Sequence, residues 1–211
     1  MRTDVRPLIL DKLKQSTRIH HERASKSIDI LHAHLSIEEY RNILQKLWGF
    51  YKPLEALIAN ERAWPLSLLN FDHRKKTPLL EYDLHVLGSA PSFLPICTDL
   101  PELADFSQVL GCLYVLEGAT LGGQIIARHI RKRLDLDQAN GCSYFCSYGA
   151  ETNEMWNTFC HILATHASSS TIENQMLQAA HSTFVKFNAW LEEGTGNTGR
   201  GVTLRAPMSQ E

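Results

Sequence analysis

The sequence predicts an all-α, single-domain protein. Apolar residues recur at helical spacing over most of the chain, and no run of alternating apolar residues is long enough for a sheet strand. The 211 residues contain no internal repeat and fit one large domain better than two. The formal net charge of −2 gives no indication of nucleic-acid or membrane binding.

Three helices are expected in the first part of the chain. The first spans about residues 7–30, with Pro7 in a position that suits a first helical turn. The second begins at the capping box of residues 36–39, and Pro53 is expected to bend or break it. The third spans residues 78–87, with Gly88 as its stop.

The second half is expected to hold the longest helix. Residues 89–101 contain three prolines and are predicted to be a loop. A long glycine-bearing helix follows at 103–134, and two more are expected at 151–166 and 171–192. Residues 194–211 are polar and glycine-rich, which predicts a flexible tail after a helical domain of residues 1–193.

The cysteines and the N-terminus predict where in the cell the protein resides. The five cysteines include no CxxC pair and no zinc-site spacing, so they are expected to be reduced thiols in a cytoplasmic protein. The N-terminus lacks the apolar core of a signal peptide, and no apolar run is expected to reach membrane-spanning length.

Residues 113–129 of the long helix contain three glycines, Gly118, Gly122 and Gly123, where alanine would stabilise it by roughly 1 kcal/mol each. A missing Cβ lets another surface approach the backbone closely. Gly118 and Gly122 share one face, on a stripe that includes Val115. This bare face suits either a tightly crossing helix or a flat ligand, and the segment alone does not separate the two.

Two adjacent histidines, His20 and His21, lie on the first helix. A neutral imidazole is a good axial ligand for iron. Two histidines that only face solvent on an amphipathic helix would give the same sequence pattern. Adjacent helix positions point about 100° apart, so at most one can face a given site. Lys14 could pair with an anionic group of the same cofactor, or lie on a solvated face.

Other polar residues allow two interpretations. Glu117 adjoins Gly118 but points elsewhere, so a structural hydrogen bond is favoured over catalysis. The basic cluster 74–76, with Asp83 on the next helix, could be only a loop surface. The basic residues of 128–133 complement the helix dipole, or could neutralise propionate groups or dock an acidic electron donor. Core positions are expected at six apolar residues: Trp156, Phe159, Ile162, Phe184, Phe187 and Trp190.

Several segments together resemble the heme oxygenase family, and within it the bacterial branch that supplies biliverdin to bacteriophytochromes. The strongest match is residues 111–123, which run from Gly111 to Gly123. The supporting segments, in chain order, are residues 13–21, 47–55, 74–75, 83–88, 94–97 and 100–101. The resemblance covers about residues 8–192.

The resemblance implies heme held between the first helix and the glycine-bearing helix. In the family the axial histidine lies four residues after a threonine, which is His21 after Thr17. Lys14 falls where a lysine pairs with a heme propionate. Gly118 and Gly122 fall on the distal glycines, whose backbone heme and O2 approach, and Val115 lies on the same stripe.

The implied reaction uses O2 and electrons to open heme to biliverdin, carbon monoxide and ferrous iron, so that heme is both substrate and cofactor. The implied partners are an electron donor, such as a ferredoxin or a reductase, and a bacteriophytochrome. Many family members carry an aspartate directly after the first distal glycine, where this chain has Ala119. Ordered water and backbone groups would then have to deliver protons.

Two alternatives remain at the level of sequence. The first is a non-catalytic heme-binding or heme-sensing protein of the same fold, which Ala119 favours. The second is a helical-bundle enzyme of another chemistry, such as a di-iron carboxylate protein or a thiaminase-type protein. A di-iron bundle should show Glu-x-x-His pairs on two helices, and the sequence contains no such paired motif.

Overall fold

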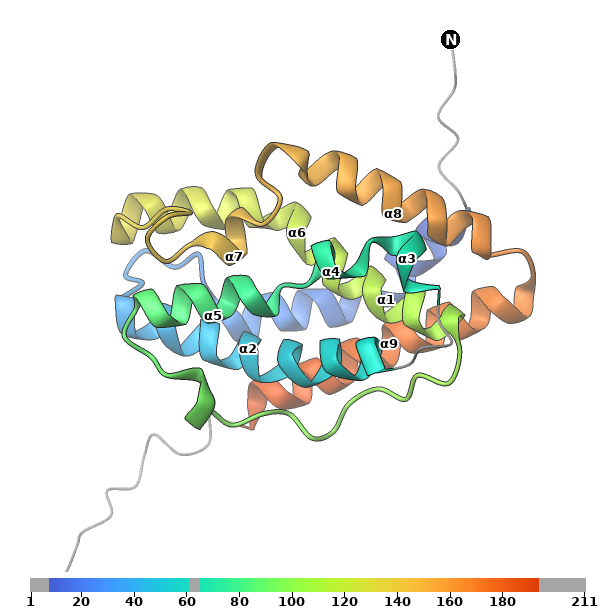
Figure 1. Cartoon of the computed structure of the whole chain (residues 1–211), viewed down its shortest axis with the longest axis horizontal. Coiled ribbons are helices and arrows are strands. Elements are labelled where there is room, and N and C mark those ends of the chain that lie inside the picture. Colours follow the sequence, from blue (N-terminus) through green and yellow to red (C-terminus); the bar gives the residue numbers. More distant parts are fainter. Residues whose placement is uncertain (1–7, 61–64, 194–211) are drawn as a thin grey trace, which may run out of the picture.

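The computed structural model describes residues 8–60 and 65–193, and every regular element within these ranges is helical (Figure 1). The helices are α1 (Leu8–Ile28), α2 (Ile37–Asn60), α3 (Leu66–Leu69), α4 (Phe71–Arg74), α5 (Thr77–Val86), α6 (Phe106–Leu134), α7 (Ser143–Cys146), α8 (Thr152–His166) and α9 (Ser170–Glu192). Short 3-10 turns lie at Pro91–Phe93 and Gly149–Glu151. The predicted all-α class is confirmed, and the tail 194–211 lies outside the described residues.

The helix ends follow from local hydrogen bonds. The Ser36 hydroxyl accepts from the Glu39 N–H at 3.2 Å, and the Glu39 carboxylate accepts from the Ser36 N–H at 2.8 Å, which confirms the predicted capping box. Asp105 and Gln108 form a second capping box, so α6 begins at Phe106 and not at residue 103. Gly88 follows α5 with a φ of 73°, as its predicted role as a stop requires.

Of the two outcomes expected at Pro53, a bend or a break of the second helix, the break does not occur, because α2 continues to Asn60. Proline has no N–H to donate to the carbonyl of Gly49. The backbone N–H of Cys97 donates to that carbonyl instead, at 2.8 Å. A Cβ at Gly49 would lie 2.6 Å from both the Pro95 carbonyl oxygen and the Trp190 ring, so glycine lets the loop come close enough.

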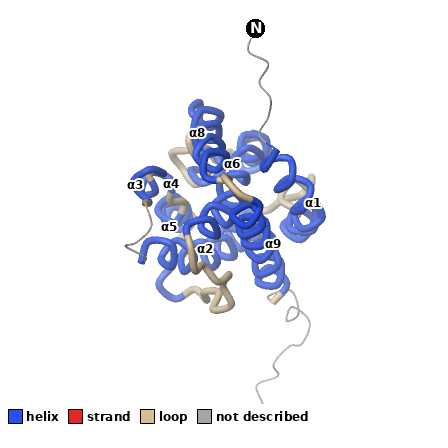
Figure 2. The backbone as a smooth tube through the Cα atoms, turned by 90° about the vertical axis from the view of Figure 1, so that its right-hand side faces the viewer, coloured by secondary structure: helices blue, strands red, loops and turns tan. Residues whose placement is uncertain are grey.

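Helix α9 is the common packing partner of α1 and α6, and α6 also packs against α7 and α8. Figure 2, turned by 90° from Figure 1, shows this cluster of helices nearly end-on. The predicted core residues Phe159, Phe184, Phe187 and Trp190 are buried, and Trp156 and Ile162 pack partly buried against them.

The glycines of α6 divide into two classes. A Cβ at Gly111 would overlap the carbonyl of Met176 on α9, and a Cβ at Gly123 would overlap the carbonyl of Phe145 on α7. A Cβ at Gly118 would make only an ordinary contact with the Trp156 ring, at 3.9 Å, and a Cβ at Gly122 would meet no described atom within 4 Å. Close packing therefore explains Gly111 and Gly123, and it does not explain Gly122.

Helix α6 corrects the expectation that no apolar run reaches membrane-spanning length. By length and composition it could cross a membrane, with a mean hydropathy of 1.5 over its most apolar window. Half of that window is buried within the fold, as in the core helix of a soluble protein. Its apolar character is therefore accounted for by the packing of α6 against α7, α8 and α9.

All five cysteines are free thiols, as expected, and all but the half-buried Cys146 are buried. Burial raises the pKa of Cys112 and of Cys142 to about 12. Both residues are therefore protonated at neutral pH and behave as small apolar side chains.

Alanine substitutions at the glycines of α6 should separate the two classes. Gly111→Ala and Gly123→Ala should each lower the free energy of unfolding by about 1–3 kcal/mol, because each forces a helix away from a backbone carbonyl. Gly122→Ala should leave stability unchanged or raise it by up to about 1 kcal/mol. Urea denaturation followed by circular dichroism measures this difference, and equal destabilisation of all three variants would contradict it.

Candidate functional site

The open side of α6 carries the glycines that packing does not explain. Val115, Gly118 and Gly122 lie within an arc of about 60° on the helix. Val115 is buried, Gly118 is half-buried and Gly122 is exposed, so the arc passes from the core to the surface. The exposed apolar side chains of Leu121 and Ile125 lie close to it in sequence. A flat apolar ligand could lie against the backbone here without displacing a side chain at Gly122.

The two histidines of α1 have different neighbours on α9. The ring of His20 packs edge-on against His181, with centroids 4.6 Å apart, whereas the ring of His21 meets Phe184 at 6.2 Å. On α9, Phe184 is turned about 80° from Met176, the residue that touches α6, and His181 is turned about 140° from it. His21 therefore lies on the side of α1 that is nearer to α6.

The two rings also differ in exposure. His21 is exposed, and among the described residues its ring makes no hydrogen bond, so a ring nitrogen can serve as a ligand. His20 is half-buried, and burial, followed by the neighbouring His181, lowers its pKa.

Lys14 and Arg18, two cations of α1, differ in their ion pairs. Lys14 lies two turns before His21 on nearly the same face, is exposed, and forms no ion pair within the described part of the chain. Arg18 pairs with Glu22 at 3.2 Å on the solvated surface. Lys14 is thus the cation of this face that remains available to an anionic group.

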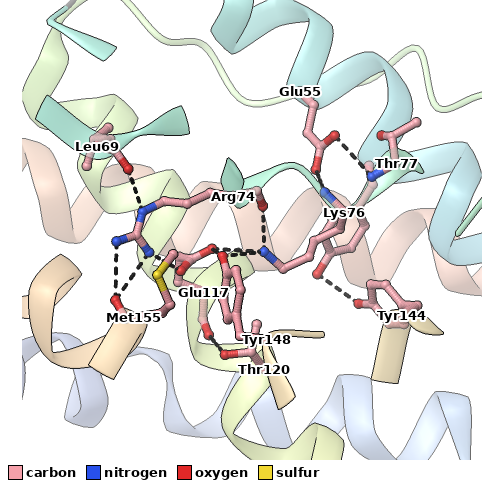
Figure 3. A network of polar contacts seen from close by, with 11 residues as sticks. Glu55, Leu69, Arg74, Lys76, Thr77, Glu117, Thr120, Tyr144, Tyr148 and Met155 are labelled. Carbon is pink, nitrogen blue, oxygen red and sulfur yellow. Dashed lines mark hydrogen bonds and ion pairs between the residues drawn. The ribbon is translucent and has the colours of Figure 1, made fainter. Parts of the chain in front are cut away.

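The inner side of α6 carries a buried ionic cluster around Glu117 (Figure 3). Its carboxylate pairs with the guanidinium of Arg74 and, at 3.1 Å, with the ammonium of Lys76. The Tyr148 hydroxyl donates to the same carboxylate at 2.8 Å. The favoured structural role of Glu117 is confirmed. The interpretation of residues 74–76 as a loop surface is wrong for Arg74 and Lys76, which are 4% and 2% exposed.

Each charge in this cluster has several partners. Arg74 donates to the carbonyls of Leu69, at 2.7 Å, and Met155, at 3.2 Å, so it joins α6 to the end of α3 and to α8. The Lys76 ammonium donates to the Arg74 carbonyl, to Glu117 and to the Tyr148 hydroxyl. Burial lowers the pKa of Lys76, and the neighbouring Glu117 carboxylate opposes that shift.

Two further carboxylates fix the neighbouring helix starts. Glu55 on α2 accepts from the backbone N–H groups of Lys76, at 2.6 Å, and Thr77, at 3.2 Å, at the start of α5. The fully buried Asp83 accepts from the N–H groups of Ser143 and Tyr144 at 2.8 Å each, at the start of α7. This Asp83 contact holds α7 in the place where it packs against α6.

Comparison with known proteins decides the family. A sequence model described as heme oxygenase matches residues 8–193. The chain belongs to the heme oxygenase family. Membership confirms the predicted function class, a heme-degrading oxidoreductase. The bacteriophytochrome-associated branch is a finer assignment that the comparisons do not reach.

Individual heme oxygenases resemble this chain over most of its length. A heme oxygenase of Xanthomonas campestris pv. campestris (strain 8004) is 27% identical over 161 residues, which cover 75% of this chain and 92% of that protein. The NO- and CO-bound heme oxygenase of Neisseria meningitidis superposes with a TM-score of 0.73 at 22% identity, covering 88% of this chain and 90% of that one.

A third relative was solved with heme bound. Heme oxygenase-1 from the cyanobacterium Synechocystis sp. PCC6803 in complex with heme superposes with a TM-score of 0.69 at 18% identity. The match covers 90% of this chain and 93% of that one. Both structural likenesses confirm the heme oxygenase fold. Among the described residues, no group of three or more His, Cys, Asp or Glu side chains could hold a metal ion.

Removal of the charge on Glu117 should be far more costly than removal of a surface charge. Glu117→Gln leaves Arg74 and Lys76 buried with a neutral partner, which should lower the free energy of unfolding by about 3–5 kcal/mol. The matched control is Glu173→Gln, which breaks the partly exposed pair with Lys12 and should cost less than about 1 kcal/mol. Similar urea midpoints for the two variants would show that the cluster does not stabilise the fold.

Proposed function

We propose that this heme oxygenase binds heme between α1 and the open side of α6, with His21 as the axial iron ligand. The observation that carries the proposal is the empty space beside Gly122, where a Cβ would meet no described atom within 4 Å. A glycine inside a helix lowers stability, so a glycine without a packing partner is expected where a ligand lies against the backbone. A porphyrin is flat and apolar and could lie against the helix at this position.

The surrounding residues suit the chemistry of heme. His21 offers an imidazole that makes no hydrogen bond in the described part of the chain and lies against the apolar ring of Phe184. Lys14 offers a cation for a propionate from the same face of α1. Val115 and Gly118 contribute an apolar surface on the α6 side, with no charged group between them and Gly122 on that face.

Bound heme supplies both the iron at which O2 is reduced and the ring carbon that is oxidised. The residues of the chain orient it: His21 holds one face, and the backbone at Gly118 and Gly122 lies against the other. The proposed products are biliverdin, carbon monoxide and ferrous iron. The proposed setting is cytoplasmic, with a ferredoxin or a reductase as electron donor and a bacteriophytochrome as acceptor of the bilin.

A second candidate function has a specific observation in its favour. Ala119 follows the first distal glycine and carries no group that can donate a proton. Without a replacement donor, the protein would bind heme and O2 but leave the ring intact. A heme-binding or heme-sensing protein of the same fold is therefore the alternative that turnover experiments must exclude.

The ligand assignment can be tested on the two histidines. His21→Ala should abolish the histidine-ligated absorption spectrum of the hemin complex, and added imidazole should restore it. His20→Ala should keep that spectrum, because its ring faces His181 instead. Loss of ligation in His20→Ala alone would move the ligand by one residue and overturn the assignment.

The reaction itself can be tested by single turnover. The hemin complex, supplied with electrons in air, should convert to a pigment absorbing in the red, with release of one carbon monoxide per heme. Gly122→Leu is the negative control: it should fold normally, because its side chain points into open space, and should lose hemin affinity. Accumulation of an O2 complex without biliverdin, after many equivalents of electrons, would favour the heme-binding alternative.

A further inference from the structure

Three exposed apolar side chains lie on the end of α5 and on the connection that follows it. Phe93, in the turn 91–93, is 89% exposed, and Ile96, three residues later, is 48% exposed. Val86 on α5 is exposed as well, and α5 packs against this turn. Isolated exposed apolar residues are common, but a group of them is typical of an interaction surface. We call Val86, Phe93 and Ile96 the Phe93 patch.

The backbone beside this patch has free hydrogen-bond donors. Residues 94–100 belong to no helix. The N–H of Cys97 donates to the Gly49 carbonyl on α2 at 2.8 Å, whereas among the described residues the N–H groups of Ile96 and Thr98 have no acceptor. Ile96 and Thr98 are exposed and Cys97 is buried, which is the alternation of an extended chain. One edge of this segment therefore binds α2, and its other edge is open, as at the edge of a β-sheet.

The described part of α9 ends beside the same segment. The green connection between α5 and α6 runs along α2 and α9 in Figure 1. The Lys186 ammonium on α9 pairs with the carboxylate of Asp99. Burial raises the pKa of the Cys97 thiol, and the nearby carboxylate of Glu193, the last described residue, also raises it. The chain that follows Glu193 therefore starts close to Ile96.

The sequence after Glu193 suits an open edge of this kind. Residues 194–201 include four glycines and can serve as a linker. Residues 202–205 read Val-Thr-Leu-Arg, and β-branched residues such as Val and Thr favour extended backbone. In an extended chain Val202 and Leu204 lie on one face, so they can cover an apolar surface together.

The charges of the two regions are complementary. Residues 86–105 contain three acidic residues and no Lys or Arg. One of the three, Glu102, is exposed and forms no ion pair in the described part of the chain. Residues 194–205 contain Arg200 and Arg205 and no acidic residue. Attraction between the two regions therefore favours their contact.

The linker is long enough to bring these regions together. Eight residues, 194–201, separate Glu193 from Val202. A glycine-rich chain of that length has a root-mean-square end-to-end distance of about 14–17 Å, and it spans at most about 30 Å when extended. Because the α9 end already lies beside the open edge, the effective concentration of residues 202–205 there is in the millimolar range. A weak contact is therefore enough to hold them.

The Phe93 patch and residues 202–205 match in apolar character, in charge and in reach. We propose that residues 202–205 bind this patch of their own chain as an added extended strand. Their backbone carbonyls accept from the free N–H groups of Ile96 and Thr98. The side chains of Val202 and Leu204 cover the exposed ring of the patch. The proposal involves no heme, so it stands or falls separately from the proposed heme oxygenase reaction.

The contact is tested first from the side of the added strand, in the full chain. The double variant Val202→Asp/Leu204→Asp should release it, and amide hydrogen exchange at Ile96 and Thr98 should become about tenfold faster than in the wild type. The matched control places the same two charges in the linker, as Thr195→Asp/Asn197→Asp, and should keep the wild-type rates. Equal exchange rates in the wild type and in the first double variant would overturn the proposal.

The second test starts from the patch. Phe93→Ser should leave the fold intact because the ring is 89% exposed, and it should release residues 202–205. Their backbone order, measured by ¹⁵N relaxation, should then fall to that of the linker. Leu68→Ser is the control, because it removes an equally isolated, exposed apolar side chain from α3. Unchanged order in Phe93→Ser, or the same loss of order in Leu68→Ser, would contradict the contact.

The same measurements distinguish other occupants of the patch. Exchange rates at Ile96 that do not depend on protein concentration are expected, because the occupant belongs to the same chain. Protection that grows with protein concentration would show that a second molecule supplies the occupant, and the proposal would be wrong. Protection of Ile96 that persists in Val202→Asp/Leu204→Asp would likewise assign the patch to another segment.

Discussion

Glu117 directly precedes Gly118 in the sequence, and its carboxylate is buried. A buried charge lowers the folding stability by several kcal/mol unless it is paired. Of its partners, Arg74 is the last residue of α4 and Lys76 directly precedes α5. Arg74 also holds the Met155 carbonyl at the start of α8. One charge requirement therefore fastens two separate segments, residues 74–76 and α8, to the inner side of α6 and fixes the orientation of its outer side.

Helix α6 combines two opposite uses of glycine. At Gly111 and Gly123 the missing Cβ admits the backbones of α9 and α7, so these positions draw the helix into the core. At Gly122 the missing Cβ leaves the backbone bare toward solvent. Because Gly122 and Gly123 are adjacent, their directions differ by about 100°, and the same turn of helix faces both the core and the proposed ligand.

The long helices could be predicted because each buries a stripe whose period is visible in the sequence. The four-residue helices α3, α4 and α7 were missed, since so few residues show no period. The burial of Arg74 and Lys76 was also missed, because basic residues in a loop are exposed unless a distant carboxylate such as Glu117 pairs with them. That pairing joins positions more than 40 residues apart and has no local signal.

The candidate site shows the same division. The bare face at Gly118 and Gly122 was predictable from the sequence, because glycine lowers the stability of a helix and these two glycines are four residues apart, on one face. Which glycines serve packing was not predictable, since it depends on where the carbonyls of Met176 and Phe145 lie. The tolerance of Pro53 has the same origin: the donor that replaces its missing N–H comes from Cys97, in a loop far along the chain.

The burial of the thiols has a practical consequence for spectroscopy. With a pKa of about 12, the thiols of Cys112 and Cys142 are almost entirely protonated at pH 7, and alkylating reagents react with the thiolate. Burial also raises the pKa of the half-buried Cys146. A cysteine introduced on an exposed turn of α1 would therefore outcompete these native thiols for a fluorescent or spin label, allowing the approach of α1 to α6 to be followed in solution.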